Sequence, residues 1–346
     1  MPRGIAAVID RLAGHRIALV LAGGNALGAY QAGAYQVLHE HGIEPDWIVG
    51  TSAGAINGAV IAGNAPRDRV ARLESLWRPR AEGGWPMWWE AIPETWRRTG
   101  EALTTMLAGR SGLFAPAGSA AQTAATPAIY DTAPMRGSLA HLVDFERLNA
   151  GHVRYGALAV DLGSGRETLF DTAEQRIDAD HIRASAAMPP TFPAVPIGGR
   201  LFVDGGLSAN LPIDAVLGTA RERPVLCIAI DLLPDAAPLP QTLGEVIGRT
   251  QDLLFSGQSR RAVDRWRDAY ATDPDAASRS VTLVRLSYTD QRQEVAGKAM
   301  DFSPATIRAR WNSGMRDAAA LVTHLTSGVV PLGRPGLSIH DIVPAT

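Results

Sequence analysis

The sequence has little of several features that would point to a function at once. Its 346 residues include a single cysteine, Cys227, so no internal disulfide can form. It has no Cys-x-x-Cys pair and no cysteine–histidine cluster that could hold a structural zinc ion. The 33 basic and 35 acidic side chains leave a net charge of −2, whereas nucleic-acid-binding proteins normally carry a basic excess. We therefore expect neither a disulfide scaffold, nor a zinc module, nor a nucleic-acid partner.

Long apolar runs are absent as well. No segment approaches the ~18 uninterrupted apolar residues that a membrane-spanning helix needs. The first residues carry Arg3, Asp10, Arg11 and His15, a pattern that does not match a secretory signal. With 46% apolar and 20% charged residues, the chain has the composition of a globular protein, and we expect a cytoplasmic one.

The first part of the chain predicts alternating strands and helices. The apolar run 17–22 is followed by Gly23 and Gly24, and the short segment 46–50 closes on Gly50, a pattern typical of buried strands of a parallel sheet. Segments 26–41 and 53–62 follow them and have the pattern or composition of helices. Two strand–turn–helix units in succession indicate a βαβ arrangement. Further strands are expected at 155–161, 201–203, 225–231 and 281–286, and further helices at 243–267 and 304–325. We predict a three-layer α/β fold with a mainly parallel central sheet.

Residues 50–54 (Gly-Thr-Ser-Ala-Gly) form the pattern Gly-x-Ser-x-Gly between a predicted strand and a predicted helix. A serine at this place sits on a sharp turn with its hydroxyl exposed, and the two glycines relieve crowding. The following helix points its free N–H groups toward the same place. Taken alone, the pattern fits a packing turn equally well. We interpret Ser52 as a candidate nucleophile that Gly50 and Gly54 support.

A glycine-rich turn at residues 23–28 also lies between a strand and a helix. Backbone N–H groups in such turns converge on negative charge, either a phosphate or an oxyanion. A dinucleotide site fits poorly, because Asn25 stands at the middle glycine position and no acidic residue ends the second strand. The turn also lacks the lysine of a phosphate-binding Walker loop. We interpret Gly23, Gly24, Asn25 and Gly28 as an oxyanion hole.

Asp204 leaves a predicted strand into Gly205 and Gly206. By itself, an aspartate in this position is usually a turn former. None of the eight histidines stands in an obvious glycine-flanked late loop, so a Ser-His-Asp triad stays open but has no support in the sequence. Asp204 becomes a candidate catalytic residue only because it accompanies the two earlier motifs.

These three elements, in this order and spacing, resemble the bacterial patatin-like phospholipases. The segment 184–189, Asn210 and Pro212 are similar to that family as well. The resemblance covers residues 15–230, and the tail resembles an extension carried by one bacterial branch. It implies a lead-in at 1–14, a catalytic domain at 15–230 with a tryptophan-rich insertion at 77–134, and a C-terminal extension at 231–346. We expect that extension to be helical, with a late strand, and to pack on the catalytic domain.

The resemblance implies a Ser–Asp dyad rather than a triad. Ser52 would be the nucleophile, Asp204 would take its proton, and Gly205 and Gly206 would support the motif. No metal or organic cofactor would be needed. A carboxylate with a pKa near its ordinary value of ~4 is a poor base for a serine hydroxyl. The dyad would therefore rely on direct hydrogen bonding, a desolvated site and charge stabilisation by the glycine-rich loop.

Two residues depart from the family pattern. Asn25 replaces the usual glycine, and Leu27 replaces a common arginine or lysine. Asparagine is the non-glycine residue that best tolerates positive φ, so we expect the turn to survive. Loss of the basic residue makes the loop less positive and argues against tight binding of anionic substrates.

Tryptophan is concentrated in one segment. Five of the eight tryptophans and three prolines lie within 20 residues. The tryptophans are Trp77, Trp85, Trp88, Trp89 and Trp96. We favour a cap that packs on the body of the fold, and the alternative is an apolar flap that touches a membrane surface.

The sequence thus predicts a serine lipid acyl hydrolase that works through an acyl-enzyme, with a lipid or acyl ester as its substrate. The alternatives are an esterase, a thioesterase or a hydroxyalkanoate hydrolase, and, from another class, a non-catalytic lipid-binding protein. Peripheral contact with a membrane is left open, and the sequence does not indicate an oligomeric state.

Overall fold

A nine-stranded sheet forms the centre of the protein in the computed structural model, which describes residues 10–78, 94–118, 125–219, 223–291, 294 and 297–342. The strand order is β11-β10-β9-β1-β2-β5-β8-β7, and β6 pairs with β5 off this path. Six neighbouring strands are parallel: β1 (Arg16–Leu21), β2 (Trp47–Thr51), β5 (Arg154–Asp161), β9 (Val225–Asp231), β10 (Ser280–Ser287) and β11 (Gly336–Ile342). The predicted mainly parallel sheet is therefore confirmed.

The apolar runs form strands because they are buried on both faces. All seven residues of β9 are buried, and so are the last four of β1. Leu21 at the end of β1 pairs with Gly50 of β2 and with Ile230 of β9. Since β1 and β2 end side by side, the loops that follow them emerge at the same edge of the sheet.

The sheet becomes antiparallel on one side of β5. Strands β6 (Glu167–Asp171) and β8 (Arg200–Asp204) both run against β5, and β7 (Val195–Ile197) runs against β8. β8 therefore approaches the edge of the sheet where β1 and β2 end from the direction opposite to those two strands.

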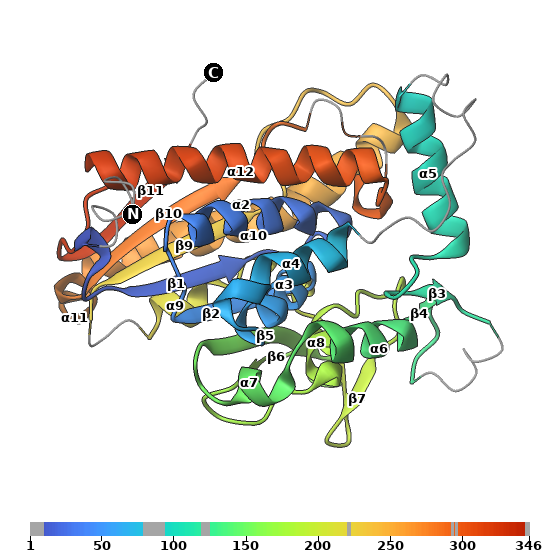
Figure 1. Ribbon diagram of the computed structural model, residues 1–346, viewed down its shortest axis with the longest axis horizontal. Helices are drawn as coiled ribbons and strands as arrows, with labels where there is room; N and C mark the ends of the chain where they lie inside the picture. Colours follow the sequence, from blue (N-terminus) through green and yellow to red (C-terminus); the bar gives the residue numbers. More distant parts are fainter. Residues whose placement is uncertain are drawn as a thin grey trace.

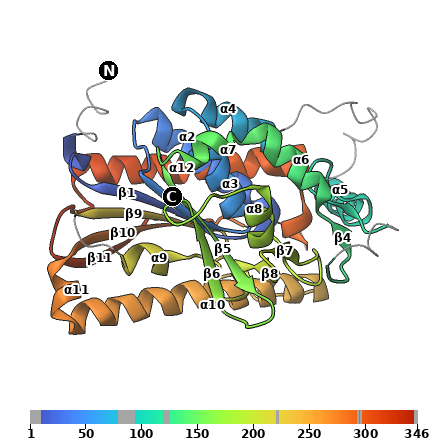
Figure 2. The ribbon, with the colours of Figure 1, turned by 90° about the horizontal axis from the view of Figure 1, so that it is seen from below.

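Helices cover both faces of the sheet (Figures 1 and 2). Helices α2 (Ala29–Glu40), α3 (Ala53–Ala62), α4 (Pro66–Trp77) and α12 (Pro304–Ser327) lie over one face. Helices α9 (Ile213–Leu217) and α10 (Leu243–Thr272) lie over the other. These three layers confirm the predicted architecture. None of the described helices is long and apolar enough to cross a membrane.

Helix α12 crosses α2 at unusually short range. A Cβ atom on Gly33 would come within 2.0 Å of the Trp311 carbonyl oxygen, and one on Gly314 within 2.0 Å of the Tyr30 carbonyl oxygen. Glycine is required at both points because two backbones meet there. The Tyr30 hydroxyl also donates to Asp317 Oδ2 over 2.6 Å. The last long helix is thus part of the core around the first one.

The remaining elements are short or lie at the rim. They are α5 (Glu94–Ala108), β3 (Ala115–Pro116), β4 (Tyr130–Asp131), α6 (Ala133–Leu142), α7 (Phe145–Asn149), α8 (Ala179–Ser185), α11 (Pro274–Ser278) and the 3₁₀ turns η1 (Asn25–Gly28), η4 (Gly205–Leu207) and η5 (Lys298–Met300). The C-terminal part adds two strands to the sheet, and the sequence predicted only β10.

One predicted helix begins later than expected. Residues 25–28 form the 3₁₀ turn η1, in which Leu27 N–H donates to Gly24 O over 3.1 Å, and α2 begins at Ala29. The apolar spacing of residues 26–41 could not separate this tight turn from the helix behind it.

The tryptophan-rich segment is described only at its ends. Trp77 closes α4 and is buried, while Trp96 on α5 is 77% exposed. Trp85, Trp88 and Trp89 lie outside the described residues, so the choice between cap and flap stays a prediction.

Candidate active site

Ser52 stands on a strained turn between β2 and α3. Its backbone has φ 56° and ψ −123°, a conformation that residues other than glycine rarely adopt. A Cβ atom on Gly50 would lie 2.4 Å from the carbonyl carbon of Gly54, and one on Gly54 would lie 2.2 Å from Leu21 O. Both glycines are therefore needed to bring α3 against the ends of β1 and β2, as the Gly-x-Ser-x-Gly pattern indicates.

The register of the sheet brings Asp204 to the same place. Leu158 of β5 pairs with Thr51, and the next residue, Ala159, pairs with Asp204 at the end of β8. Strand β5 lies between β2 and β8, so the register sets Asp204 nearly level with Thr51 at the same end of the sheet, one strand away. Ser52 and Asp204 line one cavity.

Asp204 is 1% exposed, and its two oxygens have different surroundings. Oδ1 accepts a 2.7 Å hydrogen bond from Gly206 N–H, whereas Oδ2 has no hydrogen-bond partner among the described residues. Burial raises the pKa of Asp204 from 3.8 to about 7, although the Gly206 N–H and the nearby Ser52 hydroxyl act in the opposite direction. The Ser52 hydroxyl is close enough to affect that pKa but does not meet full hydrogen-bond geometry, as is common before a substrate binds.

The last residue of α8 and the two residues after it hold both members of the pair in place. Ser52 N–H donates to the carbonyl oxygen and to Oγ of Ser185, each over 3.1 Å. Ser185 Oγ in turn donates to Leu158 O over 2.6 Å. Asp204 N–H donates to Ala187 O over 3.0 Å. One segment of three residues therefore fixes the position of Ser52 relative to Asp204.

The glycine-rich loop lies against the same serine. A Cβ atom on Gly23 would come within 3.0 Å of Ser52 Cβ and 2.5 Å of Asn210 Oδ1, so the loop could not approach so closely with a larger residue. Gly23 N–H donates to Asn210 O, but the N–H groups of Gly24 and Asn25 have no partner within the described part of the chain. Gly24 and Asn25 line the cavity and can offer these donors to a developing negative charge.

Asn25 adopts φ 51°, which confirms the prediction that asparagine holds this turn in the left-handed region. Its side chain is also engaged, because Nδ2 donates to the Met300 sulfur over 3.2 Å. Gly28 has a different place: it does not line the cavity, and a Cβ atom there would lie 2.7 Å from the Trp77 ring. Gly28 therefore allows the ring of Trp77 to pack against the loop.

Two groups of side-chain amides, the buried Gln31 and Asn57 and the half-buried Gln258, hold these loops from behind. Asn57 Nδ2 donates to Gly28 O, and Gln31 Nε2 donates to Ala22 O over 2.8 Å, so that both ends of the loop are tied down. On the other side, Gln258 of α10 accepts from Asn210 N–H over 3.0 Å and donates to Gly206 O over 3.1 Å. The sequence analysis missed Gln31, Asn57 and Gln258. The available signal for Gln31 and Asn57 was an amide residue within a helical segment that is otherwise small or apolar.

The cavity has a volume of about 240 Å³ and is largely apolar. Besides Ser52 and Asp204, its lining includes large apolar side chains from distant parts of the chain: Leu27, Ile56, Trp77, Phe114, Met135, Met188, Phe192, Phe255, Met300 and Phe302. None of the eight histidines, all of which lie among the described residues, lines it. A serine, a buried carboxylate and free backbone donors in an apolar pocket are the parts needed for acyl transfer.

Comparison with known proteins points in the same direction. The sequence model of a family described as patatin-like phospholipase matches residues 19–217. A second model, described as patatin phospholipase, matches residues 251–327. The chain is 27% identical over 262 residues to an uncharacterized NTE family protein of Mycobacterium tuberculosis, and the match covers 72% of this chain and 38% of that relative.

Two further matches are shorter or more remote. A lysophospholipase of Aspergillus terreus is 42% identical over 76 residues, which cover 20% of this chain and 5% of the relative. Among solved structures, VipD from Legionella pneumophila aligns with a TM-score of 0.45 and 15% identity, covering 90% of this chain and 67% of VipD. The chain spans well under half the length of both sequence relatives.

Proposed function

Because the chain belongs to the patatin-like phospholipase family, we propose that it hydrolyses acyl esters of lipids with Ser52 as the nucleophile and Asp204 as its base. The observation that carries the proposal is the buried Asp204 carboxylate, which shares an apolar cavity with the serine of the strained turn. A pKa of about 7 makes Asp204 a far better proton acceptor than an ordinary aspartate.

In the first half of the reaction, Asp204 accepts the proton of the Ser52 hydroxyl while Oγ attacks the ester carbonyl carbon. The carbonyl oxygen becomes an oxyanion, and the N–H groups of Gly24 and Asn25 donate to it. When the tetrahedral intermediate collapses, the bond to the leaving alkoxide breaks and Asp204 returns the proton to that oxygen. An alcohol leaves, and the acyl group stays on Ser52.

In the second half, water takes the place of the alcohol. Asp204 accepts a proton from the water, whose oxygen attacks the acyl carbonyl carbon, and the same N–H groups stabilise the second oxyanion. The proton then passes to Ser52 Oγ as the carboxylic acid leaves. Every proton moves through one carboxylate, so the mechanism needs no histidine and no cofactor.

The character of the cavity supports a lipid substrate. Apart from Asp204, no charged side chain is found among the described residues that line it. Leu27 occupies the position where many family members carry a basic residue, and it is buried in the lining. We therefore propose that acyl chains enter this pocket and that the glycine-rich loop of residues 23–28 does not bind an anionic headgroup.

We also propose that the protein meets its substrate at a lipid surface. Six large apolar side chains on α10 and its lead-in are exposed, by 45% to 83%: Leu239, Leu243, Val246, Ile247, Leu253 and Leu254. On the helix they recur with the spacing of one face, and Gln251 and Phe255 on the adjacent face line the cavity. An apolar surface beside a pocket for acyl chains would let a lipid pass from one to the other.

Covalent labelling tests the chemistry directly. The purified protein should react with a fluorophosphonate probe, and Ser52→Ala should abolish the reaction, while Ser208→Ala, which alters an exposed serine near the site, should leave it intact. Hydrolysis of lysophospholipids and phospholipids would then be compared with that of short soluble esters. A wild-type protein that neither reacts nor hydrolyses any ester would contradict the proposal and favour a lipid-binding protein.

A further inference from the structure

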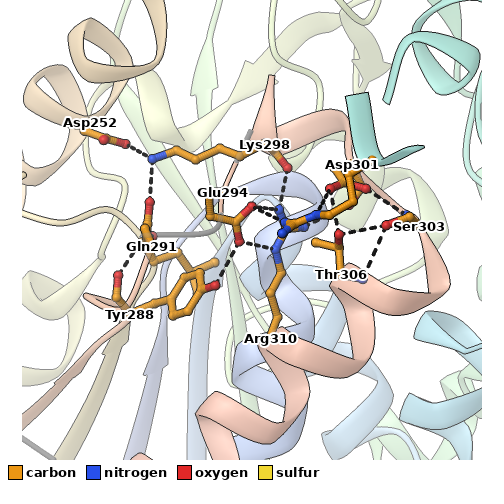
Figure 3. Close-up of polar contacts among 11 residues, drawn as sticks. Asp252, Tyr288, Gln291, Glu294, Lys298, Asp301, Ser303, Thr306 and Arg310 are labelled. Carbon is orange, nitrogen blue, oxygen red and sulfur yellow. Dashed lines mark hydrogen bonds and ion pairs between the residues drawn. The ribbon is translucent and has the colours of Figure 1, made fainter. Parts of the chain in front are cut away.

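A buried cluster of charged side chains lies beside the cavity, and the proposed mechanism does not use it (Figure 3). Its centre is Arg310 of α12, which is fully buried and forms two hydrogen bonds of 2.7 and 2.8 Å with the Glu294 carboxylate. Tyr288 and Arg98 donate to the same carboxylate, over 2.8 and 3.2 Å. Lys298, the only lysine of the chain, is buried next to this group.

The cluster grips the backbone of η5. Arg310 Nη2 donates to Lys298 O over 2.8 Å and Nη1 donates to Asp301 O over 2.9 Å, so it holds the chain on both sides of Met300. Lys298 Nζ donates to Asp252 of α10 and to Gln291. Helices α10 and α12, on opposite faces of the sheet, are therefore both tied to this one turn (Figures 2 and 3).

Electrostatics favours the charged state of the central pair. Burial alone would lower the pKa of Arg310, but the Glu294 carboxylate raises it overall. Burial alone would raise the pKa of Glu294, yet Arg310 lowers it overall. A bidentate pair that stays ionised in a buried place fixes the direction of the guanidinium as well as its position.

The turn η5, which Arg310 and Lys298 hold in place, forms part of the cavity wall. Met300 accepts the hydrogen bond from Asn25 Nδ2, and Ala299, Met300 and Phe302 line the cavity. The Phe302 ring stacks on Trp77 with centroids 6.3 Å apart and an interplanar angle of 11°. The buried charges thus hold one wall of the pocket against the proposed oxyanion loop.

We propose that Met300 determines which acyl chains are accepted and positions Asn25, and that Arg310 is a positioning residue that acts through Met300. This inference rests on the proposed function, because it assigns a role within the same cavity. A pocket wall whose backbone is fixed on both sides of Met300 should discriminate sharply between acyl chains of different length. Each methylene in an apolar pocket changes the rate by about tenfold or more.

Two substitutions at Met300 separate the two roles. Met300→Ala removes volume from the wall and should raise the preference for a dodecyl over an ethyl fluorophosphonate by about tenfold. Met300→Leu keeps the volume but removes the sulfur that accepts from Asn25. It should leave the length preference unchanged while slowing reaction with both probes by about threefold, a modest loss because sulfur is a weak acceptor.

Arg310→Lys tests the clamp, because lysine keeps the charge but not the fork of donors. If Arg310 acts through Met300, this variant should shift the length preference in the same direction as Met300→Ala, with its fold confirmed by circular dichroism. A merely structural arginine would slow both probes by the same factor. That equal slowing would overturn the role given to Arg310.

The outcomes also distinguish this inference from the proposed function. If wild-type Ser52 reacts with neither probe, the proposed function fails and this inference fails with it. If Ser52 reacts and Met300→Ala keeps the wild-type length preference, the enzyme stands but Met300 does not set the length. A preference that moves toward the longer probe supports both.

Discussion

The two parts of the chain that enclose the cavity are built by opposite means. Residues 16–217 shape it with glycine turns at strand ends, where Gly50 and Gly54 let backbones meet at distances that no side chain would permit. Residues 243–327 shape it with side chains, through the buried Arg310–Glu294 pair and the Lys298–Asp252 contact. The first part places Ser52 and Asp204, the proposed reacting groups, and the second holds the cavity wall beside them.

This difference explains why the first part could be recognised from short motifs. A glycine turn is a local feature: the residues that create it are neighbours in sequence, and Ser52 must follow a strand and precede a helix. The contact of Arg310 with η5 belongs instead to a cluster whose other members come from α5, α10 and residues 288–301. Nothing in the sequence around Arg310 indicates what it will meet.

The largest expected effect concerns the reacting pair. Ser52→Ala and Asp204→Asn should each lower kcat on a soluble ester by ~10³-fold or more, and the double variant should lose little beyond either one, because the two groups act as a unit. Asp161→Asn, which alters the carboxylate at the end of β5 outside the cavity, should retain most of the activity. Additive losses in the double variant would show that Ser52 and Asp204 do not work together.

The next effect should separate the two parts by stability. Arg310→Met leaves Glu294 buried without its main partner and should lower the free energy of unfolding by about 3–5 kcal/mol. Arg176→Met breaks the exposed pair with Glu146, which is formed over 2.7 Å, and should cost less than about 1 kcal/mol. Urea unfolding of both variants measures the difference. If both variants lost the same free energy of unfolding, the buried Arg310–Glu294 pair would contribute no more to stability than an exposed ion pair does.

The sequence predicted the fold and pointed to Ser52 and Asp204 as candidate reacting residues, but it did not predict the contacts that hold them. It indicated the parallel strands, the helix of residues 53–62 and the positive φ of Asn25, because periodicity and residue type determine these locally. It gave no sign of the antiparallel approach of β8, since strand direction depends on pairing with β5. It also predicted Asp204 without its raised pKa, because burial is a property of the whole fold.

That raised pKa predicts how activity and stability change with pH. Asp204 must be ionised to accept a proton, so kcat/KM should rise about tenfold per pH unit up to a pKa of about 7 and then level off. A neutral ester should be used as the substrate, so that only the enzyme titrates. An acid limb near pH ~4 would contradict the effect of burial on Asp204.

The same carboxyl makes a second prediction, for stability. Because its pKa is raised from 3.8 when unfolded to about 7 when folded, the folded protein binds the extra proton between these values. Its stability should therefore fall as pH rises through this window and stay lower above it. Asp204→Asn removes this penalty and should stabilise the protein above pH ~7, by at most about 4 kcal/mol, with little change below pH ~4.

The smallest effect is expected on the outer face of α10, where the second part of the chain meets solvent. Replacing Leu243 and Ile247, which are 76% and 63% exposed, by serine removes apolar area that nothing in the described structure covers. Stability should change by less than about 0.5 kcal/mol, because neither side chain is packed. Binding to phosphatidylcholine vesicles should weaken by about 30-fold, since each of the two exposed apolar side chains stabilises contact with the interface by roughly 1 kcal/mol. Hydrolysis of a soluble ester should be unaffected.

Val329→Ser, at an equally exposed site beyond α12, should alter none of these measurements. If the two α10 substitutions leave vesicle binding unchanged while the protein still binds vesicles, lipid must reach Ser52 across another face, and α10 serves only to support the pocket from within.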